Sequence, residues 1–294
     1  MLVLLAAFLA LVVGITLGLL GGGGSILTLP LLVYLLGMDQ KQGIAGSLFV
    51  VSLTSLVALS AHARRGVVQW KTGLLFGAVG MVGAYLAGRM AAWIPGPILL
   101  LGFGLVALAS GLAMMRERKE SSPREGPLPI ARAAALGFLV GGISGLVGAG
   151  GGFMIVPALT LLGGLAVVQA IGTSLLVIAM QSLAGFVGHF AHVHLDWQVL
   201  GVVAGFAIVG SLVGSQLGKK LSAATLRRSF AWLILFMGAF ILVREAPEEL
   251  LQMPAIRAGG GLALLALVGV AVRNARLGRA ARDPSADSTG LPRA

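Results

Sequence analysis

The sequence predicts an all-α, polytopic bundle of transmembrane helices, built from two inverted repeats that each contain a broken or re-entrant Gly-rich helix. Of the 294 residues, 57% are hydrophobic and 11% are charged, and a soluble domain carries about twice that share of charge. Several apolar stretches reach the roughly 20 residues that cross a bilayer as a helix. Residues 14–70 also align without a gap with residues 141–197, and 19 of these 57 positions are identical.

Glycines and rare residue types carry this repeat. Gly18, Gly21, Gly23, Gly24 and Pro30 align with Gly145, Gly148, Gly150, Gly151 and Pro157, and Ser47, His62 and Trp70 align with Ser174, His189 and Trp197. The chain has only four His and four Trp, so composition alone does not explain a shared position for one of each. An internal repeat in so apolar a chain predicts a transporter.

Ten apolar segments follow the same order in the two halves. They are expected near 2–20, 26–37, 43–61, 71–90 and 97–115, and again near 131–148, 153–163, 170–188, 198–217 and 226–243. The chain therefore divides into a first repeat at 1–115, a polar linker at 116–130, a second repeat at 131–243, an extra C-terminal helix at 256–273 within 244–273, and a basic, disordered tail at 274–294. The first segment lacks the basic residues of a signal peptide and continues into the first repeat, so we expect it in the mature protein.

Lys and Arg predict the orientation. They gather in the linker and after Arg273, whereas the loop at 189–197 has neither and the loop at 244–256 is net acidic. Cytoplasmic loops are rich in Lys and Arg, so we expect the linker and the C-terminus on the cytoplasmic side of the membrane. Five elements per repeat, an odd number, then place the halves in opposite orientations, with His62 near the inner face and His189 near the outer face.

The second segment of each half is too short to cross the bilayer, so the Gly-rich turn before it is expected inside the membrane. As a helix, residues 26–37 cover about 18 Å of the roughly 30 Å hydrocarbon core. Interrupted segments at matching positions point to a binding site, with a close-packing hinge as the alternative. The residues expected to bind a small anion through backbone amides are Gly21, Gly22, Gly23, Gly24 and Ser25, and Gly148, Gly150, Gly151 and Gly152.

Side chains near the turns add further candidates. Ser47, Thr173 and Ser174 begin the third segments, and their hydroxyls could donate either to an oxyanion or to their own helix. His62 and His189 are candidates for gating or proton sensing, with an interfacial anchor as the alternative. A metal site is not expected, because His189, His192 and His194 do not share a helical face. Weaker polar candidates are Ser25, Thr28, Thr54 and Gln181.

Residue types that are missing from the chain, or from its apolar segments, exclude several functions and substrates. The chain has no cysteine, which excludes disulfides, Fe–S clusters and thiol catalysis. No nucleophile–base pair or metal motif predicts an enzyme, and no cofactor is expected. All ten Asp and Glu lie in loops, at segment ends or in the tail, so the substrate is expected to be anionic or neutral. The net charge of +11 is expected to meet lipid headgroups rather than nucleic acid.

The stretch GLLGGGGSILTLPLL and its counterpart GLVGAGGGFMIVPAL, each followed by Ser-Leu and by His-x7-Trp, resemble the TauE/SafE family of sulfite exporters. The resemblance covers roughly residues 10–243. It implies transport of sulfite, sulfonates or related anions such as thiosulfate across the bacterial inner membrane, with the substrate at the two Gly-rich turns and at Ser47 and Ser174. Gly152 replaces Ser25, so the two half-sites are not equivalent.

The sequence thus predicts a secondary transporter of a small, sulfur-containing anion that works by alternating access. An anion channel on the same scaffold and a non-transporting membrane scaffold are the alternatives. The expected partners are the anion and the lipid bilayer, and an oligomer of identical chains is left open.

Overall fold

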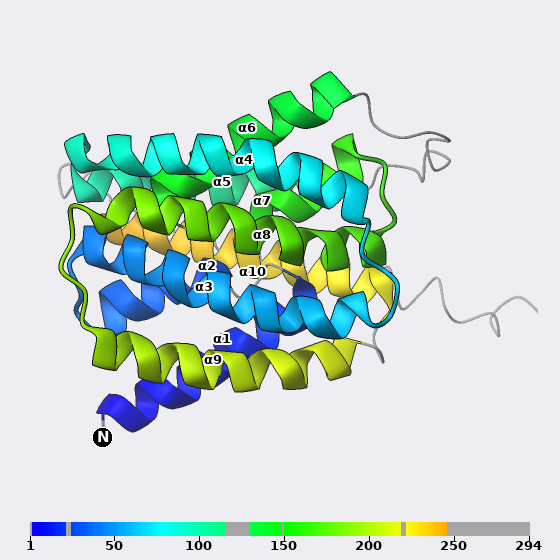
Figure 1. Cartoon of the computed structure of the whole chain (residues 1–294). Helices are drawn as coiled ribbons and strands as arrows, with labels where there is room; N and C mark the ends of the chain where they lie inside the picture. The colour runs from blue at the N-terminus through cyan, green and yellow to red at the C-terminus, as the bar shows by residue number, and fades with distance from the viewer. Residues whose placement is uncertain (1, 22–24, 116–129, 149, 219–221, 246–294) are drawn as a thin grey trace, which may run out of the picture. The chain divides into compact units, whose positions relative to one another are not determined.

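The computed structural model describes residues 2–21, 25–115, 130–148, 150–218 and 222–245, and every regular element among them is a helix (Figure 1). The all-α prediction is therefore confirmed. Residues 116–129 of the predicted linker, the extra helix expected at 256–273 and the tail at 274–294 lie outside the described residues.

The two halves contain matching elements in the same order. The first half comprises α1 (Leu2–Leu20), α2 (Ser25–Pro30), η1 (Leu31–Leu35), α3 (Gln40–Ala63), α4 (Trp70–Met90), η2 (Ala91–Trp93) and α5 (Gly96–Met115). The second comprises α6 (Ile130–Val147), α7 (Gly152–Pro157), η3 (Ala158–Leu162), α8 (Val167–Phe190), α9 (Trp197–Leu217) and α10 (Ala223–Glu245).

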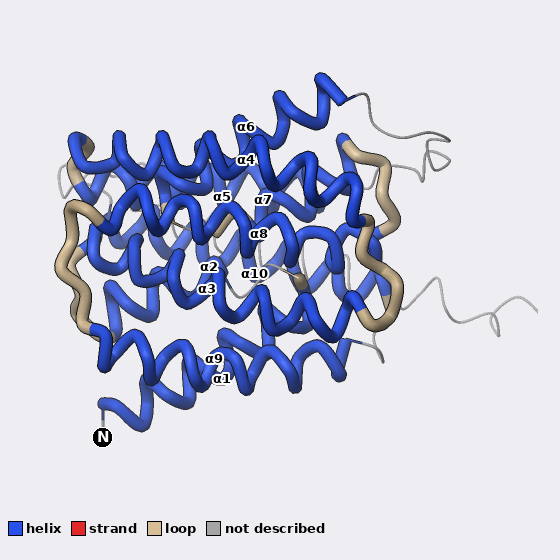
Figure 2. Tube along the Cα trace, in the orientation of Figure 1, coloured by secondary structure: helices blue, strands red, loops and turns tan. Residues whose placement is uncertain are grey.

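Six helices are long and apolar enough to cross a membrane, and they are the last three helices of each half. They are α3, α4 with η2, α5, α8, α9 and α10. The segment formed by α2 and η1, Ser25–Leu35, is shorter, as expected from the sequence. Figure 2 shows the loop between α3 and α4 and the loop between α8 and α9 at opposite ends of the bundle.

A proline and a π-helical turn interrupt the short segment of each half in the same way. Pro30 and Pro157 end α2 and α7, and a proline has no N–H to donate. Wider hydrogen bonds follow: Leu36 N–H donates to the Leu31 carbonyl oxygen at 3.1 Å, and Gly163 N–H donates to that of Ala158 at 2.9 Å. The structure therefore contains the broken helices that the sequence predicts.

The first helix of each half packs along the fourth helix of the other half, so that α1 lies on α9 and α6 lies on α4. Small residues permit this close approach. A Cβ at Gly18 would overlap the backbone of Ser211, and a Cβ at Gly145 would overlap the backbone of Ala84. The two halves are therefore joined by a pair of equivalent interfaces.

At the centre of the bundle, α3 and α8 pack against each other and run antiparallel. Gly185 approaches the Leu48 side chain near one end of the pair, and Gly172 approaches Val67, just beyond the last residue of α3, near the other. Residues in the middle of α3 therefore lie beside the middle of α8. The helices α5 and α10 form a second antiparallel pair, in which Gly104 meets Leu242 and Gly111 meets Leu235.

The helix α3 begins three residues before its predicted start. Asp39 is the cap, and its carboxylate accepts a hydrogen bond from the Lys41 backbone N–H at 3.0 Å. Because a carboxylate cap stabilises the first turn, the polar residues Gln40, Lys41 and Gln42 are helical, although their polarity is typical of a loop.

Candidate functional site

Two serine–glycine contacts join the halves at the Gly-rich turns. The Ser47 hydroxyl, in α3, donates to the carbonyl oxygen of Gly148, which follows α6. The Ser174 hydroxyl, in α8, donates to the carbonyl oxygen of Gly21, which follows α1. Each hydroxyl also lies 2.8 Å from a carbonyl oxygen of its own helix. A hydroxyl has a single hydrogen to donate, which its two carbonyl acceptors share, so each serine bridges its own helix and the turn of the opposite half.

Backbone angle and space both require glycine at these contacts. Gly21 and Gly148 have φ of 67° and 74°, a conformation that strains other residues. A Cβ at Gly21 would overlap Ile171, and a Cβ at Gly148 would overlap Ile44. Since these isoleucines also match in the repeat, the same interlocking contact is built twice.

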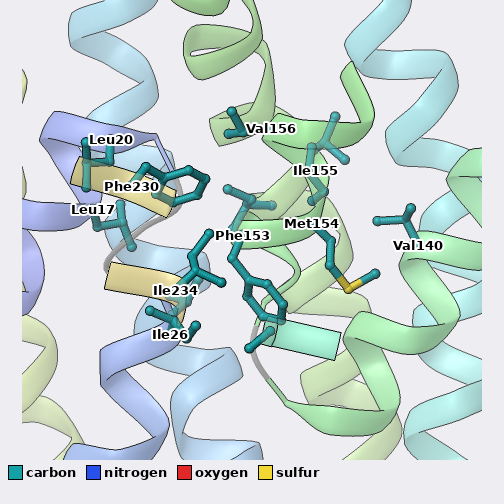
Figure 3. Packing of buried hydrophobic residues seen from close by; sticks show 14 of the residues in the cluster. Leu17, Leu20, Ile26, Val140, Phe153, Met154, Ile155, Val156, Phe230 and Ile234 are labelled. Atoms are coloured by element: carbon teal, nitrogen blue, oxygen red, sulfur yellow. The ribbon is translucent and has the colours of Figure 1, made fainter. Parts of the chain in front are cut away.

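The two contacts lie at different depths in the bundle. Ser47 and Ser174 each lie seven residues after the first residue of their helix, which is about 10 Å from that helix end. Because α3 and α8 are antiparallel, the two contacts are near opposite ends. The short helices that follow the turns nevertheless contact each other, α2 against α7, and Figure 3 shows Ile26 of α2 and Phe153 of α7 in one packed cluster.

Gly150 and Gly151 bring the second turn to the middle of the α3–α8 pair. A Cβ at Gly150 would lie 2.6 Å from the Val51 side chain in α3 and 2.7 Å from Ser182 Oγ in α8. A Cβ at Gly151 would lie 2.6 Å from Ser144 Oγ in α6. The backbone of this turn is therefore enclosed by α3, α6 and α8 at mid-depth.

Among the described residues, every buried side-chain polar atom without a hydrogen-bond partner belongs to Ser55, Ser144 or Gln181, here called the unpartnered set. Ser55 and Gln181 lie near the middle of α3 and α8, and Ser144 lies against Gly151. Leaving a buried polar group unpaired costs about 1–3 kcal/mol, and such groups are rare in folded proteins. A polar ligand or a water molecule that reached any of these three side chains would be stabilised by it.

Other predicted residues have different surroundings. Thr173 Oγ1 accepts a hydrogen bond from the Gln69 backbone N–H at 2.9 Å and so fixes the start of α4. Ser25 and Gly152 are buried first residues of α2 and α7. Gly22, Gly23 and Gly24 lie outside the described residues.

His62 and His189 are buried near the last residues of α3 and α8, and hence at opposite ends of the antiparallel pair. His62 Nδ1 is 3.1 Å from the Ala58 carbonyl oxygen of its own helix, whereas His189 Nε2 is 2.8 Å from the Gly145 carbonyl oxygen of α6. The matched histidines thus make different contacts, and their gating role stays a prediction. No group of three or more metal-binding side chains occurs in the part of the chain that the structure describes.

Charged groups lie at helix ends. The carboxylates in the described ranges are Asp39, Asp196 and Glu245; Asp39 and Asp196 cap α3 and α9, and Glu245 ends α10. At the other end of the bundle, Arg65 donates to the Ser215 carbonyl oxygen, and partial burial lowers the pKa of its guanidinium. The described residues therefore place no carboxylate at mid-depth that would repel an anion.

The fold and this centre define a polytopic helical membrane protein in which two interrupted helices meet inside the bundle. The family described as "Sulfite exporter TauE/SafE" matches residues 6–241. The chain belongs to this family, as its doubled Gly-rich pattern predicts.

Relatives cover most of the chain and are named as membrane transporters. A "Probable membrane transporter protein" of Xylella fastidiosa (strain 9a5c) is 35% identical over 240 residues, which are 79% of this chain and 92% of the relative. The protein YdhB of Bacillus subtilis, with the same description, is 29% identical over 76% of this chain and 90% of its own length. MJ0441 of Methanocaldococcus jannaschii, also so described, is 28% identical over 80% of this chain and 95% of its own. No solved structure matches the chain.

Sequence reasoning located the turns but missed part of what surrounds them. Ser144 is absent from the predicted candidates because it aligns with Leu17 and so leaves no signal in the repeat. Ser55 and Ser182 do align with each other, and that match was the available signal. Gln181 aligns with Thr54 and was ranked as a weaker polar candidate, although its side chain is fully buried.

Proposed function

We propose that the protein is a secondary transporter that carries a small anion, sulfite or an organosulfonate, across the bacterial inner membrane by alternating access of two inverted halves. One observation carries the proposal: Ser144 of the unpartnered set borders the Gly-rich turn at Gly151, and the other two members, Ser55 and Gln181, belong to α3 and α8, the helices that enclose this turn at mid-depth. In a membrane protein, irregular backbone at that depth is buried in protein or lines a wet path. The family name supports sulfite as the cargo.

In this proposal the anion binds backbone amides of the second turn, at Gly150, Gly151 and Gly152, and amides of the matching first turn. Successive glycine amides can converge on one anion. Ser47 and Ser174 keep the two turns in place through their carbonyl oxygens. They act as positioning residues, because their hydrogens are already donated.

The packing of matched helices supports the inverted arrangement. Helices α3 and α8 are counterparts in the repeat and pair antiparallel, and so are α5 and α10. The loop between α3 and α4 contains Arg64 and Arg65, with Lys71 just beyond, which supports a cytoplasmic position for that end of the bundle. Glu245, at the end of α10, contacts Gln40 at the start of α3 and so lies at the opposite end of the bundle. A cytoplasmic C-terminus therefore requires the extra helix expected at 256–273 to cross the membrane once more.

Counterflow in proteoliposomes tests the proposal. Vesicles that contain the full-length protein and a high concentration of unlabelled sulfite are diluted into labelled sulfite. We expect saturable uptake that depends on sulfite inside the vesicle. We expect Gly150→Leu to abolish this uptake, because its side chain would collide with Val51 and Ser182. The matched control is Gly201→Leu on α9, where a Cβ meets no atom within 4 Å.

Two outcomes would contradict the proposal. Currents of single-channel size without stimulation by internal anion would indicate a channel. A scaffold would be indicated if no flux is seen for sulfite, thiosulfate or sulfonates. In that case a cooperative thermal denaturation curve must show that the protein is folded.

A further inference from the structure

Gln181 has the largest unmet hydrogen-bonding capacity in the described structure. Its side chain is fully buried in α8, and neither Nε2 nor Oε1 has a partner among the described residues. A carboxamide offers two donor hydrogens and two acceptor lone pairs. An apolar side chain of the same length would fill this space without an unpaired polar atom, so packing alone does not account for glutamine here.

The neighbouring helices leave room for this carboxamide. A Cβ at Gly80, in α4, would overlap Gln181 Nε2 and would lie 2.9 Å from the carbonyl oxygen of Gly137, in α6. Gln181 therefore reaches from α8 to the crossing of α4 and α6. The next residue, Ser182, borders the turn at Gly150, where its Oγ is 3.4 Å from the Gly150 carbonyl oxygen.

The first half has no equivalent of these polar groups. Gln181 aligns with Thr54, whose hydroxyl donates to the Val50 carbonyl oxygen of its own helix. Ser144 aligns with Leu17, which is a buried core residue. The unmet donors and acceptors of Gln181 and Ser144, on the two helices α8 and α6 that flank the second turn, therefore break the symmetry of the repeat. This asymmetry favours a ligand whose two ends differ.

We propose that Gln181 determines the specificity of the transport site by selecting anions that carry a hydrogen-bond donor of their own. This inference rests on the proposed function. Anion oxygens can accept from Gln181 Nε2 and from the Ser144 hydroxyl, but Oε1 requires a donor. Hydrogensulfite and sulfonates with a hydroxyl or ammonium group supply one. Sulfate and simple alkanesulfonates supply none and would leave Oε1 buried and unpaired.

A matched pair of ligands tests this assignment. The anions 2-hydroxyethanesulfonate and 1-propanesulfonate are similar in size and differ by a hydroxyl in place of a methyl group. Isothermal titration of the purified, full-length protein should give at least about tenfold tighter binding of the hydroxyl compound, which corresponds to one hydrogen bond. In Gln181→Met, which keeps the length of the side chain and removes both polar atoms, the two dissociation constants should agree within about twofold.

Controls separate specificity from folding. Thr54→Val changes the matching position of the first half and should keep the tenfold preference. Without ligand, Gln181→Met should melt at or above the wild-type temperature, because it removes an unpaired buried amide. Gln181→Asn keeps the amide but shortens its reach by one carbon, so this variant should lose most of the preference for 2-hydroxyethanesulfonate over 1-propanesulfonate. It provides a second test if the methionine variant misfolds.

The outcomes distinguish this inference from the function on which it rests. Equal binding of the two sulfonates by the wild-type protein, or an unchanged preference in Gln181→Met, would overturn the role of Gln181 and leave anion transport standing. If the wild-type protein binds neither sulfonate and no sulfite, the proposed function is wrong and the role of Gln181 is wrong with it.

Discussion

Ser47 and Ser174 each join a helix of one half to the turn of the other half. Their sequence context, beside a Gly-rich turn at matching positions, predicts hydroxyls that donate either to an anion or to their own helix. In the structure each hydroxyl contacts a carbonyl oxygen of its own helix and also a glycine carbonyl oxygen of the other half, 101 and 153 residues away along the chain. An internal repeat identifies residues that are shared by both halves. It does not identify which residue of the other half each of them contacts, because that contact depends on how the halves pack.

Ser47→Ala tests this bond at the level of one residue. The change removes the donor to Gly148 and leaves a buried carbonyl oxygen without its partner, so we expect about 1 kcal/mol of lost stability and a lower rate of anion uptake. Thermal denaturation in detergent and proteoliposome uptake measure the two effects. Ser60→Ala on the same helix is the control, because the Ser60 hydroxyl is exposed and bonds only to its own helix at Val57. Equal stability of the two variants would refute the role of Ser47.

For individual helices, the sequence predicts where a helix is interrupted but not which helices pack together. The short segment at Ser25–Leu35 and its counterpart were predictable, because a proline and a length below about 20 residues identify a helix that does not cross the membrane. The packing of α1 on α9 and of α6 on α4 was not predictable from a single sequence. Small residues show that a helix approaches another closely, but they do not say which one.

Gly18→Leu tests the α1–α9 interface. A side chain at this position would collide with the backbone of Ser211, and overpacking of this kind costs about 1–3 kcal/mol. We expect a lower melting temperature in detergent. Gly205→Leu on α9 changes the same residue type at a position where a Cβ meets no atom within 4 Å, and it should melt like the wild-type protein. A drop of the same size in both variants would mean that the loss comes from replacing glycine and not from the interface.

Tyr34 ties the end of the first broken segment to α10. Its hydroxyl donates to Glu245 at 2.8 Å, and Gln40 donates to the same carboxylate at 3.2 Å. We expect Tyr34→Phe to speed hydrogen exchange in residues 31–38 by about fivefold to tenfold, the effect of one lost hydrogen bond on local opening. The matching segment at 158–165 serves as an internal control, since its sequence has no tyrosine. Unchanged exchange in both segments would show that this contact does not hold the segment.

For the molecule as a whole, the helical class and the family follow from composition and from the doubled Gly-rich pattern. The prediction that the halves have opposite orientations rests on the distribution of Lys and Arg in the loops between helices. The antiparallel pairing of α3 with α8 is a separate, geometric argument for the same arrangement. The two arguments use different residues, so agreement between them is informative and can be tested with one pair of variants.

Arg64→Cys and Ala191→Cys form that pair. The two positions match in the repeat, and both are exposed, just beyond α3 and α8. Because the chain has no cysteine, each variant carries a single thiol for a membrane-impermeant maleimide. In intact spheroplasts, an inverted repeat gives labelling at position 191 and none at 64, whereas inside-out vesicles give the reverse. Labelling of both positions from one side would mean that the halves are parallel copies, and it would remove the basis for alternating access between inverted halves.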